Sequence, residues 1–191
     1  MTVNYRLGSA WNETDDPFGL PADNRDPDAD WGPARSDVRH RLSGYLSTRI
    51  WKGLNLDTRF AASSGQPYTI ATGRDGNGDT VLNDRPAGVG RNSARGAWQA
   101  NLNERLTWRL GVGPPAAAVP IMNRIGDTMS VFTSGSAMAK RYTLVLYADA
   151  QNVLNRVNDV GYSGVMTSPF VGRPTAALTG RQIRLGAQFV F

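Results

Sequence analysis

Four oxygen-bearing side chains are closely spaced in the segment RDGNGDTVLNDR, residues 74–85. Asp75, Asn77 and Asp79 match the first, third and fifth ligand positions of an EF-hand-type calcium loop, and Asn83 follows four residues later. Carboxylate and amide oxygens are the ligands that Ca²⁺ prefers in proteins. These four residues are therefore the candidate metal ligands of the chain, and Ca²⁺ is the one cofactor that the sequence suggests.

The calcium pattern is incomplete after its fifth position. Thr80 stands where a glycine is expected, and Pro86 stands where a bidentate glutamate is expected. Asp, Asn and Gly are also the residues that tight turns select. The segment therefore predicts either a weak Ca²⁺ site or an ordinary turn, and the sequence does not decide between them.

Other chemistry has little support in the sequence. The chain has a single histidine, His40, no cysteine, and neither a GxSxG motif nor a nucleotide-binding loop. The net charge of +5 comes from arginines that are scattered through alternating patterns and do not form a stripe. We therefore expect no catalytic residue, no enzyme activity and no nucleic-acid partner.

Composition excludes a helical membrane protein. Of the 191 residues 40% are hydrophobic, and no run approaches the roughly 18 consecutive apolar residues that a transmembrane helix needs. The first residues, MTVNYRLGSAWNETDD, lack the apolar core of a signal peptide. The absence of cysteine suits an envelope protein. We expect neither a signal peptide nor a plug domain in this chain.

A period of two is clear in AWQANLNERLTWRL, residues 97–110. The odd positions from Gln99 to Arg109 are polar, which predicts a strand with one wet and one apolar face. Glu104 is the one exception in the apolar row. The apolar side chains at even positions are Trp98, Ala100, Leu102, Leu106, Trp108 and Leu110.

The same alternation recurs along the chain and predicts an all-β, antiparallel, up-and-down fold. No segment between the alternating stretches has a convincing helical pattern. We expect one partial β-barrel domain over residues 1–191. Its six strands are predicted at about 2–12, 38–51, 53–63, 97–110, 140–152 and 181–191.

Loop lengths separate two kinds of all-β fold. A soluble sandwich has turns every 8–12 residues, whereas an outer-membrane barrel alternates short turns with long loops. Here the long loops 13–36, 64–96 and 153–180 alternate with short connections such as WKG at 51–53. Strands of about 9–11 residues also suit a tilted crossing of the membrane. The pattern favours a transmembrane β-barrel segment.

Aromatic residues near the strand ends fit this interpretation. Outer-membrane barrels carry aromatic girdles at both membrane interfaces. A strand aromatic in an ordinary core is the alternative for each residue taken singly. The candidates for a girdle are Trp11, Tyr45, Trp51, Trp98, Trp108, Tyr142, Phe189 and Phe191.

Several stretches, in order, resemble the C-terminal barrel portion of TonB-dependent outer-membrane receptors, particularly the Oar-like group that carries a carboxypeptidase-regulatory-like domain. The resemblance covers the chain from about Asp37 onward, except residues 112–138. The stretches are SDVRHRLSGY, SGQPYTIATGRDGNGDTVLNDRPAGVGRN, LYADAQNVLNRVN, GVMTSPFVGRPT and a last strand that closes on Phe191.

The resemblance implies the last six strands of a 22-stranded barrel in the outer membrane of a Gram-negative bacterium. It implies outer-membrane lipid as a partner, uptake or binding of a siderophore, oligosaccharide or peptide, and coupling to the TonB complex through an N-terminal part. The terminal Phe191 resembles the signal that the barrel assembly machinery recognises. The long loops are then extracellular, and the segment at 74–85 lies in one of them.

The chain departs from the family where residues 112–138 replace a short periplasmic turn, and we expect an atypical insertion there without an assigned function. Six strands alone would have two open edges, which lipid does not tolerate. The sequence therefore suggests a fragment, a truncated gene product or one segment of a larger assembly. The alternative is a soluble calcium-binding β-sandwich that mediates adhesion or another interaction.

Overall fold

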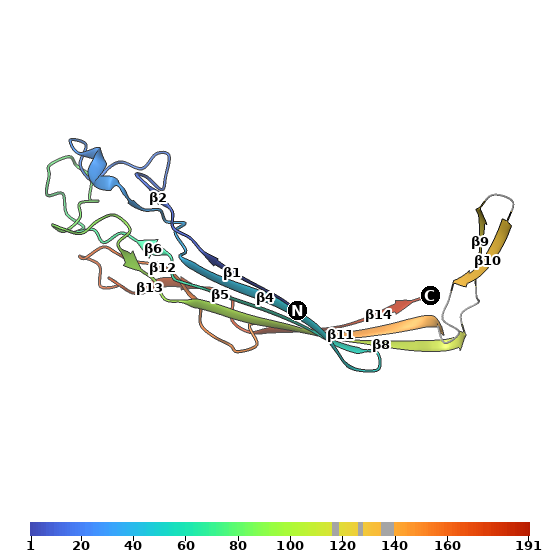
Figure 1. The fold of residues 1–191 in the computed structure, drawn as a ribbon. Helices are drawn as coiled ribbons and strands as arrows, with labels where there is room; N and C mark the ends of the chain where they lie inside the picture. The colour runs from blue at the N-terminus through green and yellow to red at the C-terminus, as the bar shows by residue number, and fades with distance from the viewer. Residues whose placement is uncertain (116–118, 126–127, 135–139) are drawn as a thin grey trace. The chain divides into compact units, whose positions relative to one another are not determined.

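The fold is all-β, and its main element is one six-stranded sheet (Figure 1). The computed structural model describes residues 1–115, 119–125, 128–134 and 140–191, with side chains described in 1–115 and 140–191. The strands of the sheet, in order, are β1 (Thr2–Leu7), β4 (His40–Trp51), β5 (Leu54–Ser63), β8 (Gln99–Pro115), β11 (Lys140–Gln151) and β14 (Gln182–Val190). Strands that follow one another in this sheet order also follow one another along the chain, and the pairs β1–β4 and β8–β11 are antiparallel. The predicted all-β class with an antiparallel sheet is therefore confirmed.

The first strand is shorter than the predicted 2–12. It ends at Leu7, and β2 (Trp11–Asn12) pairs with β3 (Gly32–Pro33) in a separate small sheet. Beyond Leu7 the Gly8 N–H still donates to the Arg39 carbonyl oxygen at 3.0 Å, but the Ala10 N–H donates to the Asp37 carboxylate, at 3.1 Å, and not to a neighbouring strand. The sequence pattern did not show this side-chain contact, so the prediction was wrong at its C-terminal end.

The fourth strand of the sheet is longer than the predicted 97–110, because β8 continues to Pro115. The expected insertion at 112–138 also contains a hairpin of two strands, β9 (Val119–Ile125) and β10 (Thr128–Ser134), which the sequence analysis did not predict. Positions 116–118, 126–127 and 135–138 of the insertion lie outside the described residues.

The register between β8 and β11 places apolar residues opposite apolar residues. Leu110 faces Leu144 and Trp108 faces Leu146, whereas on the other face Arg105 is opposite Asp149. Cross-strand partners point to the same side of a sheet, so this segment has one apolar face and one polar face, as the period of two predicted. The exceptional Glu104 does occupy the apolar row, opposite Ala150.

The register between β1 and β4 shows the same separation of faces. Tyr5 is opposite Leu42, whereas Arg6 is opposite Arg41. Tyr45 is opposite Thr2 and so lies on the polar face, where the Arg59 guanidinium carbon is 5.7 Å from its ring centre. A place for Tyr45 in an aromatic girdle on the apolar face was therefore wrong, because the odd positions of β4 turn to the other side.

His40 stands between two aromatic rings. The Tyr5 hydroxyl lies 2.8 Å from His40 Nδ1, and the His40 ring stacks on Trp98 with ring centres 5.7 Å apart. These contacts give the only histidine of the sequence a structural place at the start of β4.

The sheet faces are largely exposed in this chain. Apart from Pro67, Ala34 is the only buried hydrophobic residue among those whose burial is described. Large apolar side chains on the strands are open instead, and Leu185 is 79% exposed. The buried polar or charged residues are Asp30, Asp37, Ser64, Arg91, Asn92, Thr107, Asn152 and Asn158.

The chain divides into two compact units. The first comprises Met1–Leu46, Arg59–Asn103 and Gln151–Gln182, and the second comprises Ser47–Thr58, Glu104–Ala150 and Ile183–Phe191. The first unit contains the long connections and their short elements. Besides β2 and β3, these are β6 (Pro67–Tyr68), β7 (Ala94–Arg95), β12 (Asp159–Tyr162), β13 (Pro174–Ala177) and a 3₁₀ turn, Pro27–Asp30.

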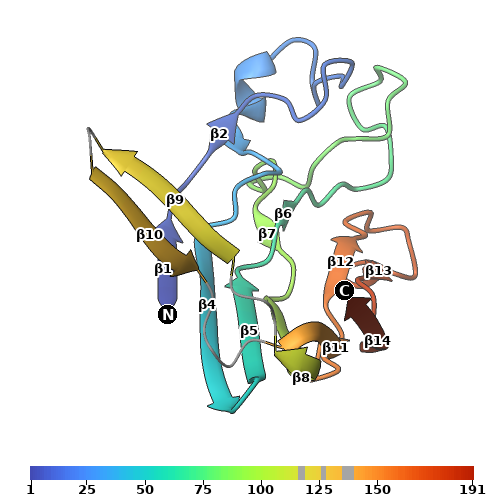
Figure 2. The ribbon, with the colours of Figure 1, turned by 90° about the vertical axis from the view of Figure 1, so that its right-hand side faces the viewer.

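The second unit contains the tight turn between β4 and β5, which run side by side in Figure 2. Gly53 has φ +78°, a left-handed conformation that favours glycine. Its carbonyl oxygen accepts a 2.8 Å hydrogen bond from the Arg109 N–H. A Cβ at Gly53 would lie 2.4 Å from the Arg109 carbonyl oxygen, so this position requires glycine for both conformation and space.

Candidate functional site

The three long connections of the main sheet meet in the first unit (Figure 1). We call residues 8–39, 64–98 and 152–181 the first, second and third long loops. The second long loop hydrogen-bonds to both of the others. The contacts are dominated by arginine, aspartate and asparagine side chains, which explains why buried polar residues outnumber buried apolar ones here.

Arg91 of the second long loop is the centre of its contact with the first. Its residue is 8% exposed, and Nη1 lies 2.7 Å from the Asp15 carboxylate. Nε donates to the Asp30 carbonyl oxygen at 2.7 Å, and Nη2 donates to the carbonyl and side-chain oxygens of Asn12. A buried guanidinium needs such partners, because an unpaired buried charge is costly. One side chain therefore joins residues 12–15 and Asp30, two segments of the first long loop.

Asp15 is the acidic partner in this network. It accepts hydrogen bonds from the backbone N–H of Arg35, at 2.6 Å, and from the Asn92 side chain. Burial by itself would raise the pKa of Asp15, but these hydrogen bonds, the charge of Arg91 and the Asn12 amide together hold its pKa below the ordinary value. The carboxylate therefore stays charged, which preserves its pairing with Arg91.

Asp37 forms a second ion pair between the same two loops. It is 2% exposed, its carboxylate accepts from Arg95 Nη2, and its carbonyl oxygen accepts from Arg95 Nη1 at 2.9 Å. Burial by itself would raise the pKa of Asp37, but the hydrogen bonds from Arg95 and Ala10 and the charges of Arg95 and Arg39 lower it below the ordinary value. Asp37 is therefore a structural carboxylate with its oxygens engaged.

Asp30 provides a third ion pair. Its residue is 6% exposed, and its carboxylate accepts from Arg85 Nη1 and from the backbone N–H of Ala22. Arg85 Nη2 also donates to the Ala29 carbonyl oxygen at 2.9 Å. The three pairs together fix the second long loop against the first.

The third long loop contacts the second through aromatic and backbone groups. The Tyr68 and Tyr162 rings stack with centres 5.3 Å apart. The Tyr162 hydroxyl accepts from the Ala97 N–H at 3.0 Å, and the Ala71 N–H donates to the Gly164 carbonyl oxygen at 3.0 Å. The second long loop is therefore in contact with both the first and the third long loop.

Three of the four predicted calcium ligands share one turn. The Asp75 carboxylate accepts from the backbone N–H groups of Asp79, at 3.1 Å, and Thr80, at 2.9 Å. The Asn77 side-chain oxygen accepts from the Asp79 N–H at 2.9 Å, and the Asp79 carboxylate accepts from the Val81 N–H at 2.9 Å. These bonds are typical of Asx turns. The side-chain oxygens of these three residues therefore accept hydrogen bonds from the backbone of their own turn.

The asparagines of the predicted set also hold the first long loop. Asn77 Nδ2 donates to the Ala22 carbonyl oxygen at 2.8 Å, and Asn83 Nδ2 lies 3.1 Å from each of the Leu20 and Pro21 carbonyl oxygens. The Asn83 side-chain oxygen is buried and has no hydrogen-bond partner within the described part of the chain. The structure thus brings Asp75, Asn77 and Asp79 together and places Asn83 at the contact between loops.

Two further observations bear on the calcium prediction. Thr80 has φ +71°, the left-handed conformation for which the calcium-loop pattern has glycine. Within the described residues, no group of three or more His, Cys, Asp or Glu side chains is arranged to hold a metal ion. A Ca²⁺ site that uses the Asn77 amide oxygen beside the Asp75 and Asp79 carboxylates stays a prediction.

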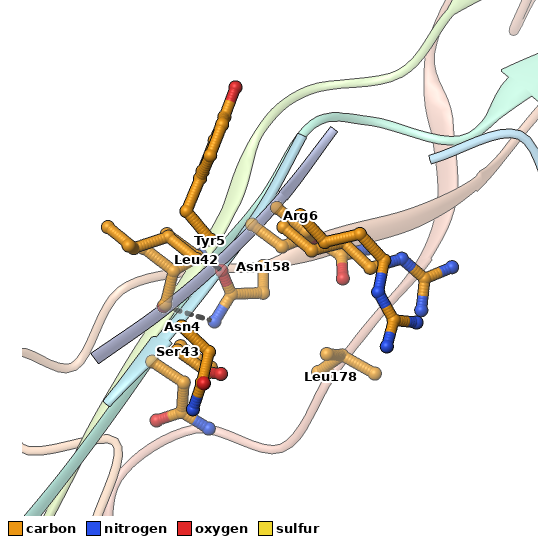
Figure 3. Close-up of a pocket in the computed structure, with 14 residues that line it drawn as sticks. Asn4, Tyr5, Arg6, Leu42, Ser43, Asn158 and Leu178 are labelled. Atoms are coloured by element: carbon orange, nitrogen blue, oxygen red, sulfur yellow. Dashed lines mark hydrogen bonds between the residues drawn. The ribbon is translucent and has the colours of Figure 1, made fainter. Parts of the chain in front are cut away.

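A groove of about 640 Å³ lies along the sheet in the first unit (Figure 3). Arg6 extends toward the side on which Leu178 lies, whereas the Tyr5 ring points to the opposite side. Asn158 of the third long loop also lines the groove. Its side chain bonds to the backbone of Ala100 through a 2.8 Å and a 3.0 Å hydrogen bond, as a neighbouring strand would.

Sequence reasoning missed the arginines that organise these sites. Arg85, Arg91 and Arg95 were treated as scattered charges, because their aspartate partners are 55 to 76 residues away along the chain. Their spacing in one loop, at every fourth to sixth position, carries no local signal. The pair Arg6 and Arg41 follows from strand register, which the sequence analysis did not assign.

Function must be inferred from this geometry and from the sequence pattern. In the part of the chain that the structure describes, no helix is sufficiently long and apolar to cross a membrane. Comparisons with protein-family models, with curated proteins and with solved structures found no match to this chain.

Proposed function

We propose that this chain is the C-terminal barrel segment of an outer-membrane TonB-dependent receptor, and that it takes part in uptake or binding of a large ligand and not in catalysis. The observation that carries the proposal is the separation of faces in the sheet. In the two pairs of the main sheet whose register is described, most apolar side chains share one face, and the arginine, asparagine and threonine side chains share the other. Glu104 on the first face and Tyr45, Val145 and Tyr147 on the second are the exceptions.

The apolar face needs a covering of low polarity. Ile183 is 65% exposed, Leu7 is 65% exposed and Ile50 is 56% exposed, each on a different strand. Burying one such side chain is favourable by about 1.5–3 kcal/mol. Exposed apolar side chains of this kind on β1, β4, β8 and β14 are unfavourable in water, and the hydrocarbon of a membrane covers them without further protein.

The alternation of long loops and a short turn supports an assignment of which connections are extracellular and which are periplasmic. The long loops fold together in the first unit, whereas the two-residue turn at Lys52–Gly53 belongs to the second. Outer-membrane barrels have short periplasmic turns and longer extracellular loops. In this proposal the three long loops face the outside and contact ligand, and the turn at Lys52–Gly53 is periplasmic.

The remaining partners follow from the same proposal. β1 and β14 are the open edges of the six-stranded sheet, and backbone groups in lipid require partners. Further strands of a larger barrel supply those partners. Phe191 stacks near Phe189, with ring centres 6.4 Å apart, at the end that the barrel assembly machinery would bind. Coupling to the TonB complex requires an N-terminal part of the receptor.

Alternating accessibility tests the proposal. Residues 1–191 contain no cysteine, so Leu146→Cys and the neighbouring Val145→Cys each introduce one labelling site in this segment. A spin label at position 146 is expected to be accessible to a lipid-soluble relaxation agent, and a label at position 145 to a water-soluble agent. The measurement is made on the protein in native outer membranes.

Two results would contradict the proposal. Equal accessibility of the two positions to the lipid-soluble agent would remove the lipid-facing side. Protection of position 146 from both agents would instead indicate a second protein layer, as in the soluble sandwich.

A further inference from the structure

The charged side chains that line the groove of Figure 3 are all positive. The groove is lined by residues of β1, β4, β5 and β8 together with the third long loop, all within the first unit. Its charged side chains are Arg6 and Arg41, and its other polar side chains are neutral, including Asn4, Ser43 and Gln99. No aspartate or glutamate is among the described residues that line it.

The two arginines are directly opposed. Arg6 and Arg41 are partners in the antiparallel ladder of β1 and β4, so their side chains leave the sheet on the same face, with Cβ atoms about 4.5–5.5 Å apart. Like charges in this position repel each other. Neither side chain has an ion pair or hydrogen bond with any residue in the described ranges.

This arrangement differs from the treatment of the other arginines in the same unit. Arg85, Arg91 and Arg95 each face a carboxylate and are committed to loop contacts. Arg6 and Arg41 form no such ion pair among the described residues, and the repulsion between their charges destabilises the pairing of β1 with β4. An anion between them would relieve that repulsion, and guanidinium groups bind carboxylate and phosphate oxygens through paired N–H donors.

The size of the groove indicates the kind of anion. Its volume of about 640 Å³ is within the range of about 300–1,000 Å³ that small-molecule sites occupy. Neutral donors beside the arginines, such as Asn4 and Ser43, suit the uncharged polar part of such a ligand. Leu178 adds an apolar contact from the third long loop.

We propose that Arg6 and Arg41 form a binding site for the oxyanion of a small acidic ligand, carboxylate or phosphate, on the polar face of the sheet. The inference rests on the proposed function, in which this face lines the barrel interior. It adds that the ligand, or a part of it that passes along this wall, is anionic.

The test is calorimetric titration of the full-length protein, purified from membranes in detergent at low salt. The probes are glucuronate, inorganic phosphate and glucose, the last being the neutral counterpart of glucuronate. We expect saturable binding of at least one anion and none of glucose. Glucuronate alone would indicate a carboxylate ligand, and phosphate alone a phosphorylated one. Binding should weaken as salt rises, because the contacts are charge–charge interactions.

Arg6→Gln and Arg41→Gln should each weaken binding of the anion about tenfold or more, because each removes a charge-assisted hydrogen-bonding group. Arg49→Gln is the matched control, since it removes an arginine from the same face of β4 that does not line the groove. Far-UV circular dichroism checks that the variants fold.

The proposal is overturned if neither anion binds better than glucose, or if Arg41→Gln and Arg49→Gln have the same affinity. Either result leaves the membrane proposal intact, because the labelling of positions 145 and 146 reads lipid exposure and not ligand binding. Failure of that labelling experiment would instead remove the barrel interior on which this site depends.

Discussion

Replacing Arg91 by methionine should release the first long loop from the second. The substitution keeps an unbranched side chain of similar length but removes the ion pair with Asp15 and the donors to the Asp30 and Asn12 oxygens. Removing one partner of a buried ion pair costs about 3–5 kcal/mol. The Asp15 side chain is 23% exposed, and water can solvate part of the carboxylate that is left, so we expect the low end, about 3 kcal/mol.

Hydrogen exchange with mass spectrometry measures this change directly. At about 1.4 kcal/mol per factor of ten, a loss of 3 kcal/mol corresponds to roughly a hundredfold increase in opening of the contact. Amides of the first long loop, such as the Ala34 N–H that donates to Ala10, should exchange faster by that factor. Amides in β11 should keep their exchange rates.

Arg74→Met is the control, because Arg74 is exposed in the same loop and its side chain has no partner among the described residues. Equal exchange of residues 8–39 in the two variants would refute the reasoning, since it would show that the Arg91 network contributes nothing to loop docking.

Three further predictions concern pH, backbone conformation and calcium. The folded pKa values of Asp15 and Asp37 are lowered, so their stabilisation of the loops is present above the ordinary value of 3.8 and is lost as pH falls through the lower folded values. Protease sensitivity of the loops should therefore rise only in that low pH range. Asp37→Asn should raise the protease sensitivity at neutral pH, because it removes the charge that pairs with Arg95. Gly53→Ala should destabilise the protein by about 1–3 kcal/mol in thermal unfolding, whereas Gly8→Ala, where an added Cβ meets nothing within 4 Å, should have little effect. If the Asp/Asn turn binds Ca²⁺, adding Ca²⁺ should protect the 64–96 loop from protease in the folded protein, and unchanged cleavage would leave only a turn.

The sequence pattern was sufficient for the strands of the main sheet but not for the loops. Alternation from Gln99 to Arg109 depends only on which face of a strand is wet, and this local rule located each strand of the sheet to within a few residues at most ends. The same rule was not enough at residues 10–12, where the Ala10 N–H bonds to the Asp37 carboxylate and Trp11 pairs with Pro33 in a separate sheet. Capture by a side chain 27 residues away has no local signature.

The candidate sites differ in how far they could be predicted. Spacing alone found the turn that contains Asp75, Asn77 and Asp79, because turn chemistry is local. The groove could not be found in this way, since Arg6 and Arg41 meet only through the register of two strands. Register depends on the loop between them, and the network that fixes this loop comes from residues of another loop.

The most direct test of the central claim is to identify the polypeptide that carries the peptide QIRLGAQFVF, residues 182–191, in fractionated cells. Peptide mass spectrometry of size-separated inner-membrane, outer-membrane and soluble fractions gives both its location and its mass. The account predicts the peptide in the outer-membrane fraction, in a band several times larger than 20.7 kDa. Recovery in the soluble fraction at 20.7 kDa would contradict the account and favour the soluble sandwich.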